Sequence, residues 1–327
     1  MWRALLLSVS CLTVSACVAT DQTRSPDLLA KAESAAKLRN EIDTLSTYAI
    51  AKYAGLTEDS ETAARNYSRL LRTVHDDPWL AEQGVFAVLR IGEVDRAIAL
   101  SKKLPPETLD ETELPRLLLA IDALKRDNRT EALSFLTTPW GNDYHAMLAR
   151  SLAAWTLLDE DPASAIRLQQ QAGGQEGLYA LMGQTLGAIM KANIGDRNSA
   201  RTDLGILWDV NARLAFGVEK EARLMALAGE TELALQRLKS FRQDVGRHPA
   251  LLGLAREIEA GNIQDLPTYT AAQGTALAFY VATAPQANQS YGDIAAVYFA
   301  MAVYLDPEMD SAKALWADTL DKADRRS

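Results

Sequence analysis

The amino-acid sequence predicts an all-α protein built as a row of about seven helical hairpins that ends in a capping helix. Three observations favour this fold. Leucine and alanine recur with helical periodicity, and runs of alternating β-branched residues are missing. Prolines fall mostly between the periodic segments, and one alanine recurs at nearly constant intervals. A single hairpin cannot bury its apolar face, whereas stacked neighbours can, so the repeat predicts an α-solenoid.

The recurring alanine follows a short turn in each of seven segments. Successive spacings are 34, 35, 33, 35 and 34 residues, followed by a gap of 61. We expect the alanine to lie where the second helix crosses the first closely, because a larger side chain would separate them. The turn before it requires a residue that tolerates positive φ. The alanines are Ala63, Ala97, Ala132, Ala165, Ala200, Ala234 and Ala295.

Helix starts are marked by proline and by capping residues. Ser25-Pro26-Asp27 predicts a helix whose first residue is Pro26. Asp77 stands directly before Pro78, and this order predicts that Asp77 is an N-cap.

The repeat divides the chain into three parts after its N-terminal leader. Residues 26–245 hold units one to six. Residues 246–274 break the period and predict an irregular amphipathic helix from His248 to Gly261, followed by a loop from Ile263 to Gly274. Residues 275–327 predict the seventh unit and a polar capping helix.

The period is that of the tetratricopeptide repeat (TPR), which this chain resembles over about residues 41–320. Its most family-like stretch carries Ala295, Phe299, Ala302 and Pro307 at relative spacings of 4, 3 and 5. The chain is also similar to long TPR proteins of α-proteobacteria. HEAT-like and Sel1-like solenoids are the rival interpretations, and their longer periods fit less well.

The N-terminal segment, residues 1–17, resembles the leader of bacterial lipoproteins. An apolar run of 11 residues, Ala4 to Val14, is too short to span a bilayer. It ends in Val14-Ser15-Ala16-Cys17, which resembles a lipobox, whose cysteine is acylated and becomes the new N-terminus. The resemblance implies a signal peptide over 1–16 and a lipidated tether over 17–25.

This resemblance also implies a location in the bacterial cell envelope, facing the periplasm. Val18 after the acylated cysteine, in place of aspartate, favours the outer membrane. Cys11 would leave with the leader, so Cys17 would carry lipid and no internal disulfide could form. An ordinary secretory signal cut at Ala16 or Ala19 is the alternative.

The TPR resemblance implies a partner-binding groove, because the first helix of each hairpin lines the concave face in this family. The candidate side chains there are partly apolar with isolated cations, which suits an amphipathic helix or an extended peptide of a protein partner. The Lys/Asn clamp of chaperone-binding family members is absent. The alternative is that several candidates are core residues. The candidates are Tyr48, Lys52, Glu82, Phe86, Leu117, Ile121, Arg150, Thr185, Ile189, Glu219, Arg223 and Tyr280.

Composition argues against several other functions. Lys and Arg number 34 against 43 Asp and Glu, and this net charge of −9 disfavours binding to nucleic acid. The histidines His75, His145 and His248 lie far apart in sequence, and no cysteine pair completes a metal site. Neither a Gly-x-Ser-x-Gly elbow nor a phosphate loop in its strand-to-helix context occurs. We therefore predict no catalytic residue, no cofactor and no metal.

Three functional hypotheses follow from the sequence. The first is a lipid-anchored scaffold that binds a protein partner, with a role in envelope assembly. The second is a structural subunit or spacer of an envelope-assembly or polysaccharide-export machine. The third and remotest is a cell-wall enzyme on a helical superhelix, because the segment after Pro307 is too short for a separate catalytic domain.

Overall fold

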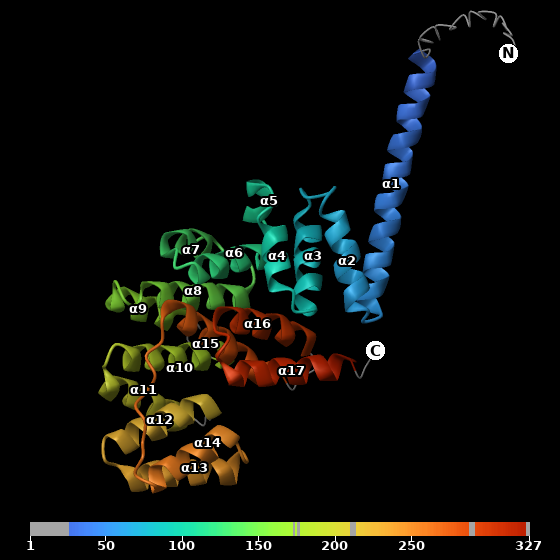
Figure 1. Cartoon of the computed structure of the whole chain (residues 1–327). Helices are drawn as coiled ribbons and strands as arrows, with labels where there is room; N and C mark the ends of the chain where they lie inside the picture. Colours follow the sequence, from blue (N-terminus) through green and yellow to red (C-terminus); the bar gives the residue numbers. More distant parts are fainter. Residues whose placement is uncertain (1–25, 173, 175–176, 210–213, 288–291, 325–327) are drawn as a thin grey trace, which may run out of the picture. The chain divides into compact units, whose positions relative to one another are not determined.

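The computed structural model describes residues 26–172, 174, 177–209, 214–287 and 292–324. The predicted leader, Cys17 and the tether lie outside these residues. The chain forms two compact units, Met1–Ser46 and Thr47–Ser327. In the described part of the chain all regular structure is helical (Figure 1). None of the described helices is both long and apolar enough to span a membrane.

Helices follow one another along the chain, and most of the loops between them are short. The helices up to Leu136 are α1 (Pro26–Leu56), α2 (Ser60–Leu70), α3 (Pro78–Arg90), α4 (Val94–Ser101), α5 (Pro106–Asp110), α6 (Leu114–Lys125) and α7 (Arg129–Leu136). The later helices are α8 (Asp143–Leu157), α9 (Pro162–Ala172), α10 (Gly177–Asn193), α11 (Arg197–Asp209), α12 (Ala215–Leu227), α13 (Thr231–Asp244), α14 (Pro249–Glu259), α15 (Ala271–Thr283), the 3₁₀ turn η1 (Ala284–Gln286), α16 (Gly292–Leu305) and α17 (Asp310–Asp324).

The recurring alanines all lie on the second helix of a hairpin, and all are buried. Their exposed fractions do not exceed 2%. The helix pairs α3–α4, α6–α7, α8–α9, α10–α11, α12–α13 and α15–α16 pack against each other. The prediction that these alanines lie at close helix contacts is confirmed, and the chain is an all-α, TPR-like solenoid of helical hairpins.

Five of the turns between paired helices contain a residue with positive φ, between 56° and 88°. In each, the following N–H reaches the carbonyl five residues earlier, as Asn128 does to Ala123 at 2.8 Å. The fourth turn differs, because neither Glu160 nor Asp161 has positive φ. The five residues are Glu58, Gly92, Asp127, Gly195 and Gly229.

One predicted helix start is confirmed. The start predicted at Pro26 stays a prediction, because Pro26 is the first residue of the described part of the chain and already lies in α1. The Asp77 side chain accepts a hydrogen bond of 2.9 Å from the N–H of Leu80, so it caps α3 as expected. Asp77 therefore has a structural role at the start of this helix.

The break in the period begins as expected and ends earlier than expected. Helix α14 is followed by Gly261 with φ +68°, and residues 262–270 are not helical. Helix α15 then starts at Ala271, inside the segment predicted as loop. Thr270 and Gln273 form a capping box there, and this Thr-x-x-Gln pattern is the signal that marks the earlier start.

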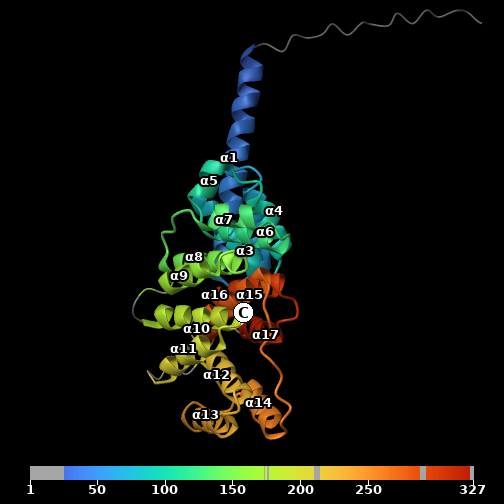
Figure 2. The ribbon, with the colours of Figure 1, turned by 90° about the vertical axis from the view of Figure 1, so that its left-hand side faces the viewer.

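The last hairpin, α15–α16, packs against helices that are distant from it in the sequence. Helices α15 and α16 contact α3, α6, α8 and α10 of the second to fifth units (Figures 1 and 2). Helix α17 packs along α16. Its Trp316 ring lies against the turn at Gly92, where a Cβ would come within 2.8 Å of the ring.

Candidate partner-binding surfaces

The first helices α3, α6, α8 and α10 present a common inner face, which we define as the side that contacts α15 and α16. The sequence predicts this face as the partner groove. In the structure, the protein's own C-terminal hairpin occupies it. The interior of a solenoid and the apolar last hairpin therefore form one core.

Four of the candidate groove residues are core side chains. Leu117 and Ile121 on α6 are fully buried, and Thr185 and Ile189 on α10 are 1% and 3% exposed. Their side chains are buried in the core, so their assignment to an open partner groove is wrong. The reason is that α15 and α16 cover the helices that carry them.

Three charged candidates hold helices together. Glu82 accepts hydrogen bonds from the N–H groups of Glu113 and Leu114 and so caps α6. Burial raises the pKa of Glu82, although these bonds oppose the rise. Arg223 on α12 bonds Glu219 at 2.9 Å. Arg223 also bonds Glu257 on α14 at 2.9 Å.

The remaining five candidates do not converge on one site. Tyr48 and Lys52 lie together on α1, with the Lys52 Nζ 5.9 Å from the Tyr48 ring centre. Phe86 and Tyr280 are partly buried against the core. Arg150 is exposed on α8. Their role in partner binding stays a prediction.

A polar chain of three side chains fixes α16 to the repeats. Glu113 Oε2 lies 2.6 Å from His145 Nδ1, and His145 Nε2 lies 2.6 Å from the Tyr298 hydroxyl. Burial opposes ionisation of Glu113, but hydrogen bonds from His145 and from the N–H groups of Gly141 and Asn142 outweigh it and lower its pKa. Burial raises the pKa of Tyr298 well above its ordinary value, so the phenol stays protonated. The sequence offered no signal that joins His145 to residues so distant in the chain.

Two further contacts fix α15 and the segment before it. The Tyr144 hydroxyl lies 2.9 Å from Thr283 Oγ1. Asn193 accepts a bond of 2.7 Å from the Tyr269 N–H and donates one of 3.2 Å to its carbonyl. Such paired backbone contacts hold an extended segment in register on α10.

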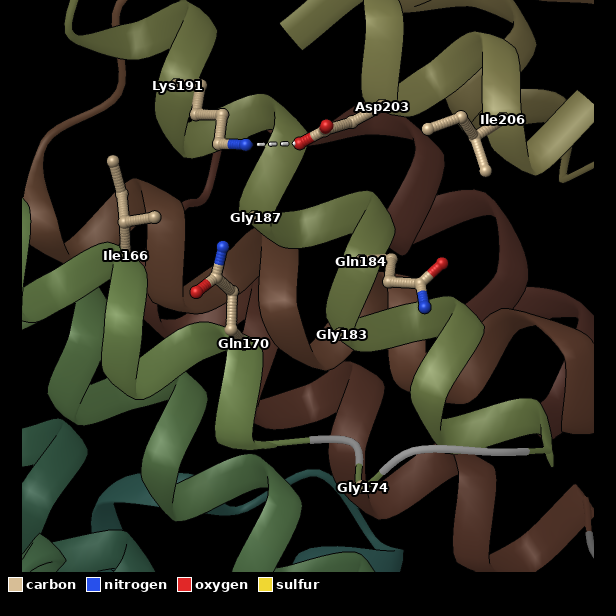
Figure 3. Close-up of a pocket in the computed structure, with 9 residues that line it drawn as sticks. All are labelled: Ile166, Gln170, Gly174, Gly183, Gln184, Gly187, Lys191, Asp203 and Ile206. Carbon is tan, nitrogen blue, oxygen red and sulfur yellow. Dashed lines mark hydrogen bonds and ion pairs between the residues drawn. The ribbon is translucent and has the colours of Figure 1, made fainter. Parts of the chain in front are cut away.

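An open groove of about 320 Å³ lies over α10 between α9 and α11 (Figure 3). We call it the α9–α11 groove. Ile166 and Ile206 stand on either side of α10, and Lys191 pairs with Asp203 at 2.5 Å. Its lining residues are Ile166, Gln170, Gly174, Gly183, Gln184, Gly187, Lys191, Asp203 and Ile206.

The floor of the α9–α11 groove is open because α10 carries glycine there. A Cβ on Gly187 would make only an ordinary contact of 3.6 Å with Gln169 Cγ. Packing of the hairpin therefore does not require this glycine. Beneath the floor, Gln169 donates a 3.2 Å hydrogen bond to the Gly183 carbonyl.

One repeat after the α9–α11 groove, an ion pair fills the space that the groove leaves open. Glu221 and Arg237 stand one repeat after the groove residues Gly187 and Asp203. Arg237 Nη2 is 3.0 Å from Glu221 Oε1, and its guanidinium stacks on Trp208 at 4.3 Å. Burial raises the pKa of Glu221 to about 7, against the opposing effect of Arg237.

Comparisons with known proteins assign no family. No protein-family model matches the chain, and no curated protein matches it. The chain is similar to the solved TPR domain of P58(IPK), with 13% identity and a TM-score of 0.30 over 87% of this chain and 91% of that one. The fold class therefore rests on the helices and contacts described above. Within the described residues, no group of three or more His, Cys, Asp or Glu side chains could hold a metal ion.

Substitution of Gly274 by alanine tests the contact between α15 and α8. A Cβ at this position would overlap carbon atoms of the buried Trp155 ring, so the helices must separate. We expect Gly274→Ala to lower the free energy of unfolding by about 1–3 kcal/mol, measured from urea unfolding. Gly253→Ala on α14 is the matched control, because no atom lies within 4 Å of its Cβ. Equal stability of the two variants would contradict the packing.

The buried Glu221 carboxyl predicts a pH dependence of stability. Its pKa of about 7 lies above the ordinary 4.5, so the fold favours the protonated form. The free energy of unfolding should therefore fall as pH rises from about 4.5 to 7, by about 3 kcal/mol. Glu221→Gln should remove this fall. The free energy of unfolding of the variant, relative to that of the wild type, should therefore be higher at pH 8 than at pH 5. Glu232→Gln, at an exposed position of α13, should follow the wild type; a Glu221→Gln variant that does the same contradicts the prediction.

Proposed function

We propose that this protein is a lipid-anchored scaffold that binds a protein partner in the α9–α11 groove and faces the periplasm from the outer membrane. The TPR-like fold supports the scaffold role, because stacked hairpins expose long continuous surfaces. The lipobox-like sequence ending at Cys17 supports the anchor. The observation that carries the binding site is the open groove itself, since the inner face is already occupied.

The lining of the groove defines the partner segment that it suits. Ile166 and Ile206 offer apolar contacts on opposite walls, and Ile206 is 53% exposed. The glycine floor admits a bulky side chain close to the α10 backbone. Gln170 and Gln184 can donate to and accept from a peptide backbone. We propose a peptide or helix that inserts one apolar anchor above Gly187.

Photocrosslinking in intact cells tests this site. A photoreactive amino acid in place of Ile206 should capture one protein, because the side chain stands on the groove wall. The same substitution at Ile194, 43% exposed and outside the groove lining, should capture none. Ile206→Arg should then remove the partner from affinity purification, while Ile194→Arg should retain it. Equal crosslinking at both positions would contradict the proposed site.

The size of the captured complex separates the scaffold from its alternative. Transient capture of one protein supports a binding scaffold. Recovery of the whole population in one large complex of fixed composition would favour the structural subunit or spacer. Release of muropeptides by the purified protein would favour the cell-wall enzyme.

Replacement of Cys17 by serine tests the anchor. The hydroxyl cannot accept the thioether-linked lipid, so the variant should move from the membrane fraction to the soluble periplasmic fraction. Fractionation followed by mass spectrometry of the N-terminus measures both effects. Acyl chains on the wild-type N-terminus are expected, and membrane association that survives Cys17→Ser would contradict the proposal.

A further inference from the structure

A second groove, of about 230 Å³, lies between α13 and α14. We call it the α13–α14 groove. Its base is apolar, with Leu238, Phe241 and Leu251 buried at 4–5% exposure. The residues that line it are Leu235, Leu238, Lys239, Phe241, Arg242, Gly246, His248, Leu251, Leu252, Ala255 and Glu259.

The α13–α14 groove repeats the construction of the α9–α11 groove. Two positions on the second helix, Ile166 and Gln170, recur two repeats later as Leu235 and Lys239. Four positions on the next first helix also recur two repeats later. The recurring positions are Gly183, Gln184, Gly187 and Lys191 on α10, and Leu251, Leu252, Ala255 and Glu259 on α14.

One wall of the repeated groove is missing. In the α9–α11 groove, α11 supplies the third wall through Asp203 and Ile206. The chain after α14 forms no such helix, because residues 262–270 are not helical and α15 packs on α8. No residue of 262–270 lines the α13–α14 groove. The open side of the α13–α14 groove therefore corresponds to the position that α11 occupies in the α9–α11 groove.

The rim of the α13–α14 groove is basic in a chain of net charge −9. Lys239 and Arg242 are exposed on α13, and neither forms an ion pair within the described part of the chain. Glu259 is the single acidic residue in the lining. His248 Nδ1 is buried in the same lining without a hydrogen-bond partner among the described residues. The exposed cations favour a ligand with acidic groups, and the buried imidazole nitrogen favours a ligand that can form a hydrogen bond with it.

We propose that the α13–α14 groove binds an acidic amphipathic helix of a partner protein, which takes the place that α11 takes beside α10. Its apolar face would cover Leu235, Leu252 and Ala255, which are partly buried. Its carboxylates would face Lys239 and Arg242. This site is separate from the α9–α11 groove and does not depend on it.

A designed peptide tests the proposal with the mature chain. The probe is a fluorescent helical peptide with leucines along one face and glutamates beside them, and its control peptide carries lysines in place of the glutamates. The acidic peptide should bind at least about tenfold more tightly than the lysine peptide, measured by fluorescence anisotropy. Added salt should weaken its binding, because the rim charges are exposed.

Matched double variants locate the binding. Lys239→Glu with Arg242→Glu should weaken binding of the acidic peptide by about tenfold. Arg72→Glu with Lys103→Glu makes the same charge change at exposed positions outside the groove and should leave binding unchanged. All four side chains are exposed, so circular dichroism should confirm that both variants keep the wild-type fold.

Several results would overturn the proposal. The first is equal affinity for the two peptides, and the second is an equal loss of peptide affinity in both double variants. The third is a crosslink from a photoreactive leucine in the peptide to a helix other than α13 and α14. A dimer in sedimentation that dissociates in the Lys239/Arg242 variant would assign the groove to a second copy instead. Ile206→Arg should not change peptide binding, so this test and that of the α9–α11 groove fail independently.

Discussion

The structure depends on the burial of apolar helix faces by a neighbouring hairpin. A hairpin of two helices leaves one face open, so each unit needs another unit beside it. The recurring buried alanines allow this stacking, because they let paired helices approach closely. The pair α15–α16 covers its apolar surface against α3, α6, α8 and α10. That arrangement covers the inner face, whereas the α9–α11 and α13–α14 grooves stay open.

Local features of the fold were predictable from the sequence because short-range interactions determine them. The alanine register, the positive-φ turns and the N-cap at Asp77 each depend on residues within one hairpin. The predicted loop runs to residue 274, whereas the capping box of Thr270 and Gln273 starts α15 at Ala271. The placement of the last hairpin depends on contacts between distant parts of the chain, such as that of His145 with Tyr298. No local pattern encodes such a contact.

One signal in the sequence did point to the buried position of the last hairpin. The segment Ala295 to Leu305 is apolar on all sides, and a helix of this kind is normally surrounded by protein. Four candidate residues were wrongly assigned to the partner groove, because helices α15 and α16 cover the helices that carry them. Position within a repeat identifies which residues face inward, but it does not tell whether another part of the chain covers them. Leu117 and Ile189 therefore belong to the core. The groove at Gly187 could not be predicted from the sequence, because three separate helices form it.

Hydrogen exchange of the backbone amides of the repeats and the last hairpin measures the central claim most directly. If α15 and α16 complete the core of the repeats, their amides should exchange as slowly as those of α8 and only through the same unfolding event. Helix α14, at the edge of the repeats, should exchange faster. Exchange of α15 and α16 that is faster than that of α14, while α8 stays protected, would show that the last hairpin is not part of the core and would contradict the account.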